Sequence, residues 1–183
     1  MNNTFAKEDM AKVLFEDHEI QKRVQELAKE ICEEYRDKNP IIIGVLRGAV
    51  LFFTDLIKCL DIHMEMNFLA ISSYGNSMES SGEIRIQYDM QESIKGRHVL
   101  IVEDIIDTGL TIDHLKEILE ARHPESIKVC SLLDKPSRRK VDVTGDYIGF
   151  VVPDEFVVGY GLDYAGKYRN LNYIGVLKPE VYE

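Results

Sequence analysis

Residues 99–112 read VLIVEDIIDTGLTI and contain the features that decide the fold. The run Val99–Val102 is wholly apolar, which is typical of a strand buried in a parallel sheet. Two carboxylates, Glu103 and Asp104, follow where this strand is expected to emerge from the sheet, and a small polar loop at 107–111 leads into an amphipathic helix. In open α/β sheets, ligands bind at the carboxyl ends of strands, beside helix N-termini.

The loop after this strand has the chemistry of a phosphate site. Backbone N–H groups at a helix N-terminus favour an anion, and Thr108 and Thr111 add hydroxyl donors. Gly109 lets the backbone approach a ligand closely. A phosphate loop alone would avoid carboxylates next to it. The pair Glu103–Asp104 therefore predicts a bound cation, or the hydroxyls of a sugar whose phosphate lies in the loop.

Strands alternate with helices along the chain, which predicts an α/β fold with a mostly parallel, doubly wound sheet flanked by helices. The segment 72–82, SSYGNSMESSG, is rich in Ser, Gly and Asn and is expected to be a mobile loop. Strands are expected at 41–45, 65–72, 84–88, 99–102, 127–133, 147–152 and 173–177, and helices at 18–36, at 49–60 and between the phosphate loop and His123.

Length and composition limit the functions that the chain can have. Its 183 residues suit a single domain, and its formal net charge of −10 argues against nucleic acid as a partner. Cys32, Cys59 and Cys130 have no CxxC spacing, so we expect reduced thiols. The N-terminal segment lacks the apolar core of a signal peptide, and no window approaches the length of a transmembrane helix. The expected location is the cytoplasm, with no membrane partner.

The stretch VLIVEDIIDTGLT resembles the signature with which type I phosphoribosyltransferases bind 5-phosphoribosyl-1-pyrophosphate. Its wording is closest to the branch of that family that acts on hypoxanthine and guanine. The resemblance implies one domain over 1–183, with a core at about 38–135. A small hood subdomain over the active site would be built from the N-terminal segment and about 136–183. It also implies Mg²⁺ as cofactor, phosphoribosyl pyrophosphate and a 6-oxopurine as small-molecule substrates, and a homodimer or homotetramer.

The same resemblance assigns roles within the signature. Glu103 and Asp104 would hold the ribose hydroxyls, the metal, or both, and would stabilise a cationic sugar. Asp107 would act as general base or acid near N7 of the purine. Leu110 is a lysine in some relatives, and the effect of this difference on donor affinity stays open. The phosphoribosyl site would comprise Glu103, Asp104, Ile105, Ile106, Asp107, Thr108, Gly109, Leu110 and Thr111.

Two further segments match the family at the pyrophosphate site and the lid. Leu46-Arg47-Gly48 matches the pyrophosphate loop, in which family members hold the peptide bond before the cationic residue in the cis form at some point in the reaction cycle. Some relatives carry lysine in place of Arg47, and much of the work of this loop is done by backbone N–H groups. Arg169 would also meet the pyrophosphate. Ser73 and Tyr74 match the start of the lid that closes over the reaction centre.

The purine site is implied by residues in the last third of the chain. Lys135 would donate to the oxygen at position 6, so that hypoxanthine and guanine are accepted and adenine is refused. Phe156 would stack on the base, and the main chain of Val157 would read its edge. Asp163 would face position 2 through its backbone and a second metal ion through its side chain or bound water. Residues 138–140 are interpreted as a solvated basic turn, and the use of xanthine stays open.

The expected reaction is transfer of the 5-phosphoribosyl group to N9 of hypoxanthine or guanine, giving IMP or GMP and pyrophosphate in purine salvage. One alternative is a non-catalytic regulator of the same fold that senses phosphoribosyl pyrophosphate or nucleotides. Such regulators usually add a nucleic-acid-binding domain or a basic face, which this acidic chain does not show. A dinucleotide-binding protein is excluded because no GxGxxG follows a strand. The segment 50–53 is either an interface helix or part of the core.

Overall fold

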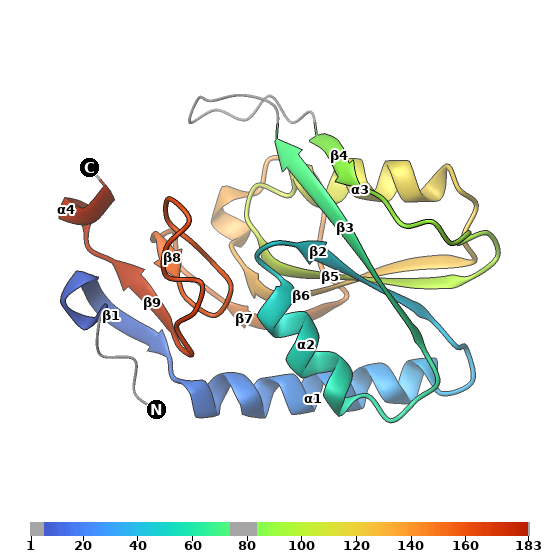
Figure 1. The fold of residues 1–183 in the computed structure, drawn as a ribbon, viewed down its shortest axis with the longest axis horizontal. Helices are drawn as coiled ribbons and strands as arrows, with labels where there is room; N and C mark the ends of the chain where they lie inside the picture. The colour runs from blue at the N-terminus through green and yellow to red at the C-terminus, as the bar shows by residue number, and fades with distance from the viewer. Residues whose placement is uncertain (1–5, 74–83, 183) are drawn as a thin grey trace.

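The computed structural model describes residues 6–73 and 84–182, and it forms two sheets that lie beside each other (Figure 1). The larger sheet has the strand order β4-β3-β2-β5-β6-β7, and all neighbouring pairs are parallel except β3 with β4. The predicted mostly parallel α/β fold is therefore confirmed. Its strands are β2 (Ile41–Leu46), β3 (Glu65–Ser73), β4 (Ile84–Tyr88), β5 (His98–Ile106), β6 (Ser126–Asp134) and β7 (Tyr147–Val151).

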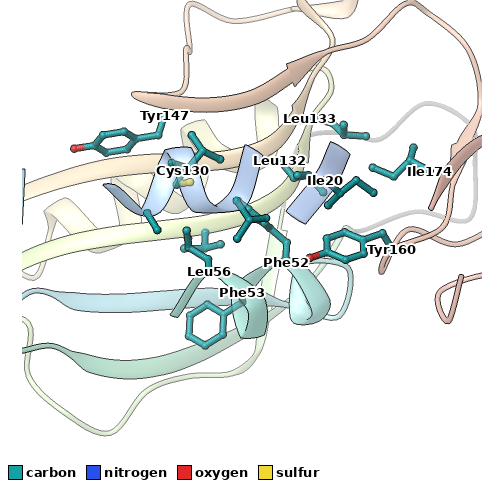
Figure 2. Packing of buried hydrophobic residues seen from close by; sticks show 14 of the residues in the cluster. Ile20, Phe52, Phe53, Leu56, Cys130, Leu132, Leu133, Tyr147, Tyr160 and Ile174 are labelled. Atoms are coloured by element: carbon teal, nitrogen blue, oxygen red, sulfur yellow. The ribbon is translucent and has the colours of Figure 1, made fainter. Parts of the chain in front are cut away.

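Helices cover both faces of this sheet, because the apolar residues of its central strands alternate between two cores. Leu100 and Val102 of β5 belong to the cluster beneath α1 (Asp17–Tyr35) and α2 (Val50–Cys59), part of which is shown in Figure 2. Val99 and Ile101 belong to the opposite cluster, which packs under α3 (Leu110–Glu120). Within the described residues, no helix combines the length and the apolar character that a membrane crossing requires.

The smaller sheet joins the two ends of the chain (Figure 1). Its order is β1-β9-β8, and both pairs are antiparallel. This sheet lies where the resemblance implies a hood. The larger sheet extends past the predicted core boundary at residue 135, because β7 pairs with β6; the division into core and hood otherwise stays a prediction. The elements are β1 (Met10–Phe15), β8 (Val157–Val158) and β9 (Ile174–Leu177), with a final short helix α4 (Pro179–Tyr182).

Strand β5 is longer than its apolar run predicts. Its pairing with β6 continues through Ile105 and Ile106, opposite Leu133 and Asp134. The acidic pair 103–104 therefore lies inside the strand, not beyond its end as predicted. The strand continues through the acidic pair because backbone pairing does not depend on the polarity of the side chains. The pair still lies close enough to the end of the strand for its carboxylates to reach a ligand.

Candidate active site

The acidic pair occupies a buried position near the end of β5. Glu103 is only 6% exposed, and it accepts a hydrogen bond from the Asp104 amide at 3.2 Å. Burial, together with the charge of Asp104, raises the pKa of Glu103 well above its usual range. Burial also raises the pKa of Asp104, against the influence of hydrogen bonds and of Arg169. Two crowded carboxylates of this kind favour a cation or hydroxyl donors in front of them.

The loop after the pair forms a cavity of about 220 Å³. Gly109 has a φ of +86°, and helix α3 begins at the next residue. A side chain at this glycine would meet the Cδ atom of Arg139 at 2.8 Å, so only glycine fits. The first helical turn therefore borders this cavity, and the predicted role of its backbone N–H groups in binding an anion stays a prediction. The cavity is lined by Glu103, Asp104, Ile105, Ile106, Asp107, Thr108, Gly109, Thr111 and Ile112.

Arg139 fixes the shape of this loop from behind. Its Nη1 atom donates to the carbonyl oxygens of Ile106 at 3.1 Å and Asp107 at 2.6 Å, while Nη2 contacts the carboxylate of Asp134. The side chain is only 15% exposed. The interpretation of 138–140 as a solvated turn is therefore wrong for Arg139. No local pattern distinguishes this arginine from its neighbours, because its partners lie on β5, on β6 and in the loop after β5.

Asp107 lies at the mouth of the same cavity. Its Oδ1 atom is 3.1 Å from Nε of Arg138, and Nη1 of the same arginine lies 3.3 Å from Oδ1 of Asp154. The Asp107 side chain is 40% exposed but its Oδ1 atom is buried, so a ligand in the cavity can reach the carboxylate only through Oδ2. The backbone carbonyl is held by Arg139, which leaves the carboxylate as the part of this residue that is open to a substrate.

The predicted pyrophosphate loop lies directly against the acidic pair. The peptide bond between Leu46 and Arg47 is cis, as the resemblance implies. A side chain at Gly48 would come within 1.6 Å of Oδ2 of Asp104, and one at Gly161 would come within 2.0 Å of the Gly48 carbonyl oxygen. Three segments that are distant in sequence thus meet at Gly48, which packs against the Asp104 carboxylate on one side and the Gly161 backbone on the other, and the absence of two side chains makes this possible.

Arg169 is brought to this meeting point. Its Nη1 atom donates to the Gly161 carbonyl oxygen at 2.6 Å, and its Nη2 atom pairs with Oδ1 of Asp163 at 2.6 Å. The second oxygen of Asp163 accepts from the Gly166 amide at 2.7 Å. Within residues 6–73 and 84–182, no three or more potential ligands are grouped to hold a metal ion. The structure therefore does not join Asp163 to the acidic pair in one cluster.

Two of the predicted purine readers, Lys135 and Phe156, line a second cavity of about 400 Å³, whereas Val157 and Asp163 are not among its lining residues. Lys135 is buried, its Nζ donates to the Glu155 carbonyl oxygen at 2.7 Å, and burial lowers its pKa. Phe156, which is 38% exposed, stacks on Tyr182 with the ring centroids 5.0 Å apart. Tyr164 meets the same ring edge-on at 5.6 Å. The sequence alone predicts no role for either tyrosine, although the high frequency of tyrosine in the last quarter of the chain could have indicated an aromatic cluster there.

The remaining predicted residues lie at strand positions. Val157 is in β8 and pairs with Val176 of β9. Ser73 is the last residue of β3 and pairs with Ile84. Tyr74, the other predicted lid residue, lies outside the described residues, as does most of the segment expected to be a mobile loop.

Residues 11–165 match the phosphoribosyl transferase domain. The chain is 58% identical over 177 residues to the hypoxanthine-guanine phosphoribosyltransferase of Bacillus subtilis, covering 97% of this chain and 98% of that protein. It is 52% identical to the enzyme of the same name from Lactococcus lactis, covering 93% of each. A crystal structure of a Staphylococcus aureus hypoxanthine phosphoribosyltransferase superposes with a TM-score of 0.95 at 45% identity, covering 99% of this chain and 98% of that one.

The chain belongs to the hypoxanthine-guanine branch of the phosphoribosyltransferase family. This similarity over nearly the whole chain favours an enzyme over the non-catalytic regulator considered above. It also agrees with the placement of the signature, because Glu103, Asp104 and the 107–111 loop line one cavity in this phosphoribosyltransferase. Neither Arg47 nor Leu110 lines this cavity, and the effect of these two departures on donor affinity stays open.

In this phosphoribosyltransferase, replacing Glu103 by glutamine is expected to stabilise the free protein at neutral pH. Because the folded-state pKa of Glu103 is raised, folding takes up a proton between the ordinary carboxyl range and the raised pKa. Stability is therefore lost as pH rises through that window. Glutamine mimics the protonated form, so we expect Tm to rise by a few °C at pH 7.5. For a chain of this size, a gain of about 1 kcal/mol in the free energy of unfolding raises Tm by about 2–4 °C.

Thermal scans between pH 4.5 and 8 measure this effect, and exposed Glu33 supplies the matched variant Glu33→Gln. The Glu103→Gln curve should lie above the wild-type curve by an amount that grows with pH. A constant offset, or an equal gain for Glu33→Gln, would show that Glu103 is not destabilised by its ionisation.

Proposed function

We propose that this chain transfers the 5-phosphoribosyl group of phosphoribosyl pyrophosphate to N9 of hypoxanthine or guanine, giving IMP or GMP and pyrophosphate in purine salvage. The observation that carries the proposal is the packing of the acidic pair, the phosphate loop and the Gly48 loop around one place. A sugar with a phosphate on one side and a pyrophosphate on the other matches this arrangement. The similarity to hypoxanthine-guanine phosphoribosyltransferases supports the same reaction.

Each group of residues around the cavity has its own role in such a transfer. The backbone N–H groups of 108–111 bind the 5-phosphate, and Glu103 and Asp104 bind the ribose hydroxyls. As the bond to pyrophosphate breaks, positive charge grows on the sugar, and the two carboxylates stabilise it electrostatically. Asp107 moves a proton at the purine ring, while Arg47, Gly48 and Arg169 bind the leaving group.

Magnesium fits the acidic pair, because Mg²⁺ binds few protein carboxylates and keeps waters and substrate oxygens as its other ligands. Glu103 and Asp104 would hold it, and a cation there would offset the cost of burying the two carboxylates, which raises their pKa values. When bound with the donor, Mg²⁺ neutralises charge on the leaving pyrophosphate. Both oxygens of Asp163 already have partners, so we propose that it contacts a second ion through bound water.

Purine recognition follows from the second cavity. The base lies against the face of Phe156 opposite Tyr182, with Val157 at its edge and the Lys135 ammonium at position 6. Nζ keeps two donors beyond its bond to Glu155, so an acceptor oxygen is favoured there and an amino group is opposed. Xanthine is included in the proposed range only as a secondary substrate, since its extra oxygen at position 2 would face the acidic side of the pocket at Asp154.

We further propose a cytoplasmic homodimer or homotetramer. The three cysteines are free thiols, which supports a reducing compartment. At the start of α2, Phe52 and Phe53 are fully buried in the core, whereas Val50 is exposed. The segment 50–53 therefore has one face in the core and one face available to a second subunit. Light scattering with the purified protein tests the oligomeric state.

A pyrophosphate-release assay tests the proposed function. Purified protein receives Mg²⁺, phosphoribosyl pyrophosphate and one base at a time, namely hypoxanthine, guanine, xanthine or adenine. Release with hypoxanthine and guanine, and none with adenine, is the expected result. Silence with all four bases, from folded protein that still binds the donor, would contradict the enzyme and favour the regulator.

A further inference from the structure

We propose that Tyr160, tied to Asp55 of helix α2, is a positioning residue for the pyrophosphate site. The inference rests on the proposed function and adds a residue that touches neither substrate. Tyr160 is 3% exposed and lies one residue before Gly161, whose backbone packs on the Gly48 carbonyl oxygen. Its hydroxyl reaches a different element, so the residue joins the turn of the smaller sheet to the helix layer.

The turn at 159–162 has an unusual backbone that requires support. Tyr160 itself has a φ of +48°, which costs free energy for a residue with a side chain. It lies between Gly159 at +100° and Gly161 at +102°. The amide of Tyr160 donates to the Leu171 carbonyl oxygen at 2.9 Å, and the ring lies in the core cluster shown in Figure 2. The side chain thus holds a strained turn in one place.

The Tyr160 hydroxyl is held by a charged acceptor. It donates to Oδ2 of Asp55 at 2.7 Å, and Nε2 of Gln21 donates to the same oxygen at 2.9 Å. Lys58 pairs with Oδ1 of Asp55 at 2.7 Å. Burial and the Asp55 carboxylate raise the pKa of Tyr160, so the phenol stays a donor at every working pH. Hydrogen bonds to a charged group are the stronger kind.

Asp55 lies on the helix that begins at the pyrophosphate loop. The Val50 amide donates to the Arg47 carbonyl oxygen at 3.2 Å, so α2 and the loop form one continuous unit. The Tyr160–Asp55 bond therefore fixes the turn relative to the loop on which Gly161 rests. It also fixes Arg169, whose guanidinium is bonded to the Gly161 carbonyl oxygen. Loss of the bond should disturb the pyrophosphate side of the site and spare the purine side.

The test is the variant Tyr160→Phe, which removes one oxygen and keeps the ring. We expect KM for phosphoribosyl pyrophosphate to rise about tenfold, because a charged hydrogen bond is lost. The KM for hypoxanthine should stay within about twofold of the wild-type value. The control is Tyr147→Phe, because Tyr147 is also buried and also donates to a carboxylate, that of Glu34. It lies on β7, and both of its KM values should stay unchanged.

Asp55 gives an independent second measurement. Asp55→Asn keeps an acceptor oxygen and should retain most donor affinity, whereas Asp55→Ala should match Tyr160→Phe. In the double variant with Tyr160→Phe, the effect of Asp55→Ala should largely disappear. Equal rises in both KM values, or additive effects of the two substitutions in the double variant, would overturn the inference, because a general loss of stability would explain them. An inactive wild-type protein would instead refute the proposed function, and the inference with it.

Discussion

Replacing Asp107 by alanine is expected to lower kcat by ~10²–10⁴-fold, the range typical of lost general acid–base catalysis. The carboxylate is the accessible part of this residue, since its carbonyl oxygen is held by Arg139. Removing the side chain therefore leaves the phosphate loop in place, and KM for phosphoribosyl pyrophosphate should change little. Steady-state kinetics with hypoxanthine at saturating donor measures both constants.

Two matched variants separate proton transfer from other effects. Asp107→Asn keeps the shape and the polar contact with Arg138 but cannot take a proton, so its kcat should fall as far as that of the alanine variant. Asp37→Asn changes an exposed aspartate beyond the end of α1 and should behave like the wild type. Near-normal turnover in Asp107→Asn would remove the proton-transfer role.

Most of the fold was predictable because its determinants are local. The parallel strands are buried on both faces, so they read as continuous apolar runs such as 41–45 and 99–102. Helix α1 follows the 3.6-residue spacing of Ile20, Val24, Leu27 and Ile31. Strand β1 was missed because its central residues are exposed, and β8 was missed because two residues carry no periodic pattern.

The candidate site was predictable wherever a motif is contiguous, as at 103–111 and 46–48. The supporting residues were not, because each depends on a contact between distant segments. Arg139 reads as a surface cation until β5 and β6 bring its acceptors together, and Tyr160 reads as an ordinary core residue until α2 supplies Asp55. The approach of Gly161 to Gly48 is likewise invisible in a single sequence, which shows glycines but not what they face.

The variant Lys135→Met is expected to lower the preference for hypoxanthine over adenine by ~10²-fold or more, since a site built around one hydrogen-bond partner rejects the wrong analogue by ~10⁴-fold. Methionine fills the same volume without a charge. The Glu155 carbonyl oxygen loses its donor in this variant, so a fall in Tm should accompany the change. Ratios of kcat/KM for the two bases at saturating phosphoribosyl pyrophosphate measure the effect.

The direction of each change identifies the cause. If the ammonium reads position 6, Lys135→Met should lower kcat/KM for hypoxanthine and raise it for adenine. The oxygen at position 6 of hypoxanthine loses its hydrogen-bond donor, and the amino group of adenine no longer faces a positive charge. Lys135→Arg keeps the charge and the donors, so adenine should stay refused even if turnover falls. Lys29→Met, at an exposed position on α1, should change neither base. An equal loss for both bases in Lys135→Met would mean that this lysine only supports the Glu155 backbone, and that another group reads position 6.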